Sequence, residues 1–68
     1  MELLQISLAA ARVNAGLTQK ELADSCHVSE KTVVNWESGK TLPNVGMLPA
    51  LESALGISAN HIRFSKTN

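Results

Sequence analysis

The fold is decided by residues 18–40, TQKELADSCHVSEKTVVNWESGK. This stretch opens with a capping box, in which the Thr18 hydroxyl can accept a hydrogen bond from the Glu21 amide while the Glu21 carboxylate accepts one from the Thr18 amide. Such a box marks the first turn of a helix, and losing it costs about 1 kcal/mol. The buried side of this helix is predicted to consist of Leu22, Ala23 and Cys26.

A second short helix follows after an interruption at His27-Val28-Ser29, where Ser29 is a good N-cap. Val33 and Trp36 are three residues apart and face inward, and the helix stops at Ser38-Gly39. Two short helices joined by so tight a turn form an angled pair, the second member of which can lie in the major groove of DNA.

The exposed residues of this second helix can read bases. Lys donates to guanine, Asn pairs with adenine and Glu accepts from cytosine. The base-reading set that we predict is Glu30, Lys31, Thr32 and Asn35.

Outward from this pair, helical spacing continues in both directions. Leu4, Leu8 and Ala11 predict a first helix that ends at Gly16. A fourth helix is predicted from the row Leu48, Leu51 and Leu55, and a short fifth helix, capped by Ser58, is predicted to contain Ile62. No strand alternation is evident. We therefore expect an all-α domain of five helices over residues 1–64, with residues 65–68 as a frayed tail.

Pro49 leaves two possibilities for the start of the fourth helix. If Asn44 is the cap, Pro49 falls at the fifth helical position and crowds the carbonyl of Val45. If the helix begins nearer Gly46, or through an irregular first turn, Pro49 is harmless. We favour the second arrangement.

The amino-acid composition excludes several classes of protein. The chain has 68 residues, six Lys and Arg against six Asp and Glu, and 44% hydrophobic residues, which suits one small globular domain. The single cysteine, Cys26, excludes an intramolecular disulfide and fits a reducing compartment. No apolar run approaches the length of a membrane span. We expect a cytoplasmic protein that has no cofactor, metal or small-molecule substrate and is not an enzyme. A net charge of zero is unusual for a nucleic-acid binder.

The motifs resemble one family. Residues from about Leu4 to Ile62 are similar to the phage repressor/Cro-type (XRE-like) helix-turn-helix family, through Gln19-Lys20-Glu21-Leu22-Ala23, Val28-Ser29, Trp36-Glu37-x-Gly39-Lys40, Leu42-Pro43-Asn44 and Leu48-x-x-Leu51-x-x-x-Leu55-Gly56-Ile57-Ser58. The resemblance implies a compact five-helix, lambda-repressor-like domain that binds double-stranded operator DNA as a dimer and regulates transcription. It also implies a phosphate-contacting set consisting of Gln19, Lys20, Ser29 and Lys40.

Two further expectations come from the resemblance. Arg12 and Glu37 occupy positions that form an internal salt bridge in many relatives, so they are expected to tie the first helix to the end of the third. His27 stands where relatives often have glycine, so we interpret it as a turn residue with positive φ rather than as a metal ligand or pH switch.

Two residues of the third helix keep alternative interpretations. Glu30 either selects cytosine or is a surface charge that weakens DNA binding. Val34 points away from the core, where it suits a thymine methyl group or a protein partner equally well. The first helix adds further apolar side chains outside its core stripe, which are Leu3, Ile6, Ala10 and Val13.

Two functions therefore remain open. The first is a small phage or bacterial DNA-binding regulator that acts as a homodimer. The second is a modulator of another regulator, such as an antirepressor, corepressor or antitoxin, that binds DNA weakly or not at all alone. Near the side expected to face DNA there are three lysines and one carboxylate, which are Lys20, Lys31, Lys40 and Glu30. The net charge of this side is therefore +2, which gives only a low non-specific affinity for DNA.

Overall fold

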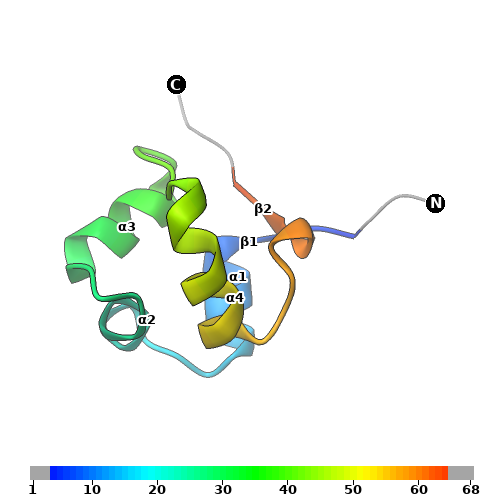
Figure 1. Ribbon diagram of the computed structural model, residues 1–68, viewed down its shortest axis with the longest axis horizontal. Helices are drawn as coiled ribbons and strands as arrows, with labels where there is room; N and C mark the ends of the chain where they lie inside the picture. Colours follow the sequence, from blue (N-terminus) through cyan, green and yellow to red (C-terminus); the bar gives the residue numbers. More distant parts are fainter. Residues whose placement is uncertain (1–3, 65–68) are drawn as a thin grey trace.

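The computed structural model describes residues 4–64, and within them four α-helices and two 3-10 turns surround a small core (Figure 1). Two short strands join the ends of this segment. In chain order the elements are β1 (Ile6–Ser7), α1 (Leu8–Asn14), α2 (Gln19–Cys26), α3 (Glu30–Ser38), a 3-10 turn (Val45–Met47), α4 (Leu48–Leu55), a second 3-10 turn (Ala59–His61) and β2 (Ile62–Arg63).

The starts of α2 and α3 agree with the predicted caps. The Thr18 hydroxyl accepts from the Glu21 amide at 3.1 Å, and the Glu21 carboxylate accepts from the Thr18 amide at 2.8 Å. At the start of α3, the Ser29 hydroxyl accepts from the Thr32 amide at 3.2 Å. Each cap satisfies amide groups that the first helical turn leaves without a backbone partner. The angled pair α2–α3 is therefore positioned by signals that lie within its own sequence.

His27 ends α2 with φ 58° and ψ 41°, which confirms the predicted left-handed turn. Among the described residues it is the one non-glycine residue with positive φ. A side chain in this conformation crowds the following carbonyl, although histidine tolerates it better than a β-branched residue does.

We expect His27→Gly to raise the free energy of unfolding by about 0.5–1 kcal/mol, because glycine adopts this conformation without steric cost. Urea denaturation measures the change. Ser25→Gly is the matched control, since Ser25 is exposed within α2, where glycine costs about 0.5–1 kcal/mol. A loss of stability in both variants contradicts the interpretation of His27 as a strained residue.

The core lies where α2 packs against α3 and α4. Leu22 of α2, Val33 of α3 and Leu51 of α4 have no exposed surface. The buried residues, which include the predicted inward faces of α2 and α3, are Leu8, Ala11, Leu22, Ala23, Cys26, Val33, Trp36, Leu51, Leu55 and Ile62. Burying these side chains is the main source of stability in a chain this short.

The described segment has four α-helices rather than the predicted five, and its first helix begins later than predicted. The first helix begins at Leu8 with Ser7 as its cap, and Leu4 precedes it with 80% of its surface exposed. In place of a fifth helix, Ser58 caps the 3-10 turn, after which Ile62 is extended. β1 and β2 pair in parallel, with Ile6 opposite Ile62, although no strand was expected. Figure 1 shows the two strands side by side against α1.

The physical reason for this correction is a contact between distant residues. Ile62 is buried, and its β-branched side chain favours extended backbone over a helical turn. Gln5 also donates a hydrogen bond to the Asn60 carbonyl at 3.2 Å. The contacts between the two ends of the described segment therefore favour extended backbone there over a helix. The predicted tail, residues 65–68, lies outside the described residues.

Pro49 lies in the first turn of α4, as the favoured interpretation requires. Asn44 caps the preceding 3-10 turn by accepting from the Met47 amide at 3.1 Å, and α4 begins at Leu48. At this first-turn position proline's missing N–H leaves no hydrogen bond of α4 unmade. No helix within residues 4–64 has the length and apolar character needed to cross a bilayer.

Candidate nucleic-acid interface

The outward face of α3 follows from its buried face. Val33 and Trp36 are buried, and each helical residue advances by about 100°. Lys31, Val34 and Asn35 therefore lie on the opposite side, and Lys31 and Val34 are exposed while Asn35 is half-buried. Within the described part of the chain, neither the Lys31 ammonium nor the Asn35 amide has an intramolecular partner. Both groups are available to a ligand that covers this face.

Ser29 and Thr32 lie together at the start of α3. Their hydroxyl oxygens are 2.9 Å apart and hydrogen-bonded, and Ser29 also accepts the Thr32 amide. Of the two hydroxyl hydrogens, one is used in this bond and the other remains to donate outward. The structure therefore couples the predicted phosphate contact of Ser29 to the predicted base contact of Thr32, because the two hydroxyls share a single outward donor.

A largely buried ion pair links α1 to the end of α3. Arg12 Nε donates to Glu37 Oε2 at 2.6 Å, and Arg12 Nη2 donates to Glu37 Oε1 at 3.3 Å. The side chains are only 16% and 8% exposed. Arg12 Nη1 also donates to the Leu17 carbonyl at 2.8 Å, so the guanidinium joins α1 and the loop before α2 to the end of α3.

Gln19 belongs to the same network, which the sequence did not indicate. Its Nε2 donates to Glu37 Oε1 at 3.0 Å. A side-chain amide nitrogen carries two hydrogens, so one N–H of Gln19 remains to donate elsewhere. The bond to Glu37 fixes the direction of that remaining donor at the first position of α2, where a phosphate contact was predicted.

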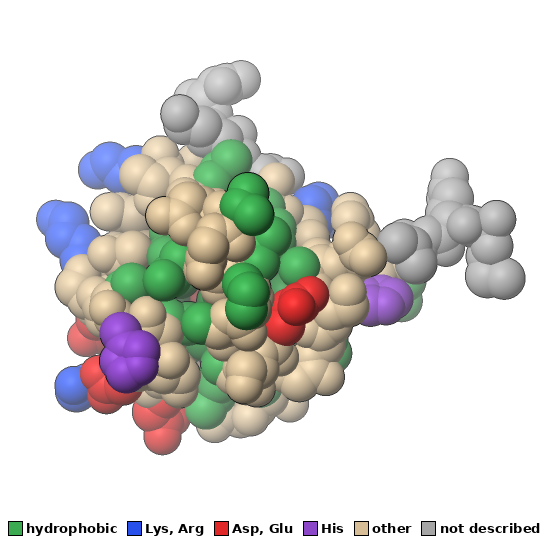
Figure 2. Space-filling view, viewed as in Figure 1, with side chains coloured by type: hydrophobic (Ala, Val, Ile, Leu, Met, Phe, Trp, Pro, Cys, Tyr) green, Lys and Arg blue, Asp and Glu red, His purple; other side chains and the backbone are tan. Residues whose placement is uncertain are grey.

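Charge on this side of the molecule is lower than the sequence count suggested. Lys20 pairs with Asp24, four residues later on α2, with 3.6 Å between Nζ and Oδ2. Asp24 was left out of the predicted balance, although the spacing Lys20-x-x-x-Asp24 is a signal for this exposed pair. With Asp24 included, the three lysines exceed the two carboxylates by one charge. Figure 2 shows basic side chains along the edge formed by α3 and the following loop, and mainly acidic ones beside α2.

Lys40 is placed by the end of α3. Gly39 has φ 80°, which reverses the chain, and the Lys40 amide donates to the Asn35 carbonyl at 2.9 Å. The backbone of Lys40 is thereby tied to the last turn of the helix, while its side chain is exposed. Glu30 is also exposed, at the first position of α3. The predicted DNA-contacting residues therefore lie on α2, at the cap before α3, on α3 and just after α3.

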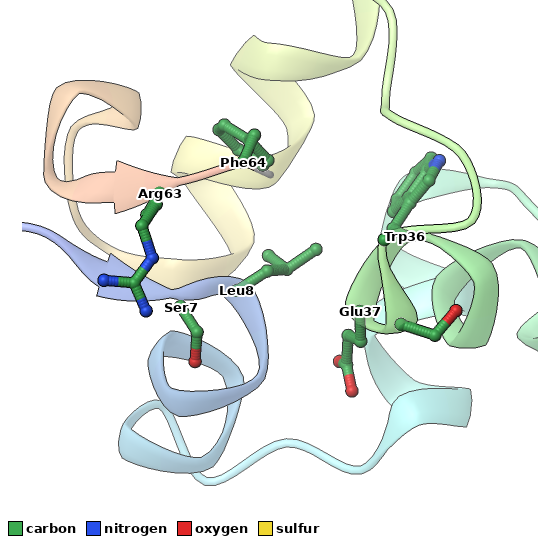
Figure 3. A pocket seen from close by; sticks show the side chains of 8 residues that line it. Ser7, Leu8, Trp36, Glu37, Arg63 and Phe64 are labelled. Atoms are coloured by element: carbon green, nitrogen blue, oxygen red, sulfur yellow. The ribbon is translucent and has the colours of Figure 1, made fainter. Parts of the chain in front are cut away.

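A pocket of about 210 Å³ lies on another side of α3 (Figure 3). Trp36 and Glu37 line it from α3, Ser7 from β1 and Leu8 from the start of α1, and Arg63 and Phe64 from the end of β2 and the residue after it. Its carboxylate, that of Glu37, is already held by Arg12 and Gln19. None of the predicted base-reading residues lines it.

Other groups of chemical interest are structural. Cys26 is buried and free, and burial raises the pKa of its thiol, which makes it a poor nucleophile. Among residues 4–64, no three His, Cys, Asp or Glu side chains gather in a way that could hold a metal ion. Of the predicted spare apolar surface, Val13 is exposed, Ile6 and Ala10 are half-buried, and Leu3 lies outside the described residues.

Comparisons with known proteins agree with this geometry. A helix-turn-helix family model matches residues 8–62. The chain is 37% identical over 46 residues to endothelial differentiation-related factor 1 of Homo sapiens, covering 68% of this chain and 31% of that protein. It is 40% identical over 47 residues to multiprotein-bridging factor 1 of Candida albicans, covering 69% of this chain and 31% of that protein.

A bacterial relative is also similar. The chain is 31% identical over 51 residues to the HTH-type transcriptional activator BcrR of Enterococcus faecalis, covering 75% of this chain and 25% of that protein. In these three relatives the matched segment spans less than a third of the full length. The chain therefore spans a third or less of the length of these relatives.

Proposed function

This chain belongs to the XRE-type helix-turn-helix family, the Cro and repressor class, and from that premise we propose that it is a sequence-specific regulator that reads operator DNA with α3. The observation that carries the proposal is the outward face of α3. It presents Lys31 and Asn35 without intramolecular partners among the described residues, and the exposed Lys40 follows at the end of the helix. Lysine and asparagine donate to guanine and adenine respectively in the major groove.

In the proposed complex, one set of residues contacts the DNA backbone and a different set contacts the bases. Gln19, Lys20, Ser29 and Lys40 approach phosphates, and the amino end of α2 adds its favourable dipole. Glu30, Lys31, Thr32 and Asn35 face base edges. Lys20 exchanges its exposed contact with Asp24, worth about 0.3–0.5 kcal/mol, for a phosphate at little cost.

The weak charge excess favours action as a dimer. One domain with a single excess positive charge near α3 gains little from phosphate attraction, whereas two domains on half-sites about 34 Å apart double the contacts. We propose a homodimer that acts in the cytoplasm without catalytic activity, of repressor type and of phage or bacterial origin.

A second candidate function is that of a protein-binding modulator that acts on another regulator. Two observations favour it, which are the net charge of zero and the exposed apolar side chains of Val13, Val34, Leu42 and Val45. A relative that is named a multiprotein-bridging factor also fits this candidate. The two functions differ in how binding responds to salt.

The proposed function predicts a salt-dependent affinity for DNA. Duplexes selected by the protein from a random library are titrated by fluorescence anisotropy between 50 and 200 mM salt. With Lys20 and Lys40 as the cationic phosphate contacts, log affinity is expected to fall against log salt with a slope of about −2 per domain. Lys40→Ala is expected to reduce this slope by about 1.

Failure of the DNA proposal has a distinct signature. If no duplex is enriched, and a mobility shift requires a second protein, the modulator is the correct function. Arg63→Ala serves as the matched control for charge, because Arg63 lies on β2 rather than on α2 or α3 and its loss is expected to leave the salt slope unchanged.

A further inference from the structure

α3 presents one large apolar side chain on its otherwise polar outward face. Val34 is 40% exposed and does not belong to the set of apolar side chains that pack against the core. Its neighbours on that face are Lys31, three residues earlier, and Ser38, four residues later, and Asn35 follows it directly in the chain. The apolar surface of Val34 therefore lies directly beside the groups that are proposed to read bases.

The surroundings of Val34 do not suit the centre of a protein-docking surface. A protein interface has at its centre a contiguous apolar patch with few charged residues. Within residues 4–64, the other large exposed apolar residues lie on other elements, in the segment before β1, on α1, in the loop after α3 and in the first 3-10 turn. On α3 itself, polar side chains flank Val34 on the outward face.

The major groove offers one apolar group at base edges, which is the C5 methyl group of thymine. A valine on a helix has one strongly preferred side-chain rotamer, so its methyl groups are held in place before binding. Because Asn35 is the adjacent residue and is suited to adenine, Val34 and Asn35 together fit a short A·T-containing step.

We propose that Val34 is a specificity-determining residue that contacts the methyl group of a thymine in the operator. This inference rests on the proposed DNA-binding function. It resolves the alternative interpretations of Val34, and it adds an apolar contact to a site otherwise made of hydrogen-bonding groups.

The test uses a thymine-to-deoxyuridine scan of a duplex selected by the wild-type protein from a random library. Replacing thymine with uracil removes the methyl group and leaves the pairing and the other groove atoms unchanged. Replacing the contacted thymine in both half-sites is expected to lower wild-type affinity about fourfold per half-site, the factor that corresponds to burying one methyl-sized group in each. Val34→Ala is expected to lower affinity for the thymine duplex by a similar factor and to bind both duplexes equally.

Val13→Ala is the matched control, because Val13 is a valine exposed on α1 and loses the same two methyl groups. It is expected to keep the fourfold response to uracil. If Val34→Ala responds to uracil as strongly as the wild type does, the inference is wrong while DNA binding stands, and Val34 is left to a protein contact. If no duplex is selected at all, the proposed function and this inference both fail.

Discussion

Replacing Arg12 or Glu37 with alanine is expected to lower the free energy of unfolding by about 2–4 kcal/mol each, the range for removing one partner of a largely buried ion pair. The pair is well shielded, since the Arg12 and Glu37 side chains are 16% and 8% exposed. Each single substitution leaves a charge that has lost its partner in a poorly solvated place. In so small a domain, this loss is a large part of the total stability.

The double variant tests the pair itself. When both residues are replaced, no unpaired charge remains, so the combined loss is expected to be smaller than the sum of the single losses by about 1–3 kcal/mol. Urea denaturation of the four proteins in the cycle measures this coupling. Strictly additive losses show that the two charges act independently, which contradicts the assignment.

Lys20 and Asp24 provide the matched control. They form an ion pair of the same charge type, but both side chains are about 70% exposed and 3.6 Å separates the charged atoms. Exposed pairs on a helix contribute about 0.3–0.5 kcal/mol. The same cycle on Lys20 and Asp24 is therefore expected to give a coupling several times smaller than that of Arg12 and Glu37.

The residues of this ion pair also orient a side chain that is proposed to contact DNA. Glu37 accepts from Gln19 as well as from Arg12, so Glu37→Ala releases the Gln19 side chain from its fixed direction. A fixed donor loses less conformational entropy when it binds than a free one does. Arg12→Ala, in contrast, leaves the contact between Gln19 and Glu37 possible.

The parts of the fold that the sequence predicts correctly depend on residues close together in the chain. The capping box of Thr18 and Glu21 and the cap of Ser29 each involve residues three positions apart. The left-handed turn at His27 was inferred from a family resemblance and lies between two such signals. Local hydrogen bonds of this kind form wherever their few residues occur in order.

The errors arise where a distant residue decides the local conformation. Ser58 is a valid cap, but the helix it predicts gives way to a strand because Ile62 pairs with Ile6. Leu4 fits the spacing of the first helix, yet Ile6 and Ser7 pair with Ile62 and Arg63 as a strand, and the helix begins only after them. At the candidate site, the resemblance led to Arg12 and Glu37, while nothing in the local pattern indicated that Gln19 shares the carboxylate, because Gln19 and Glu37 are 18 residues apart.

Asn35→Ala is expected to lower affinity for a selected duplex about tenfold to a hundredfold and to remove base preference at one position of each half-site. The reason is that a paired hydrogen bond from asparagine to adenine discriminates by about 1–3 kcal/mol. The fold is expected to survive, since the Asn35 group that accepts the Lys40 and Thr41 amides is the backbone carbonyl, which alanine retains.

The measurement compares each variant on the selected duplex and on duplexes with single base-pair substitutions. Lys40→Ala is expected to weaken binding to all of them alike, because a phosphate contact carries no base information. Asn14→Ala, an exposed asparagine at the end of α1, is the matched control and is expected to change neither affinity nor preference. If Asn35→Ala weakens all duplexes by one common factor, Asn35 does not read a base, and the discrimination must come from Glu30, Lys31, Thr32 or Val34.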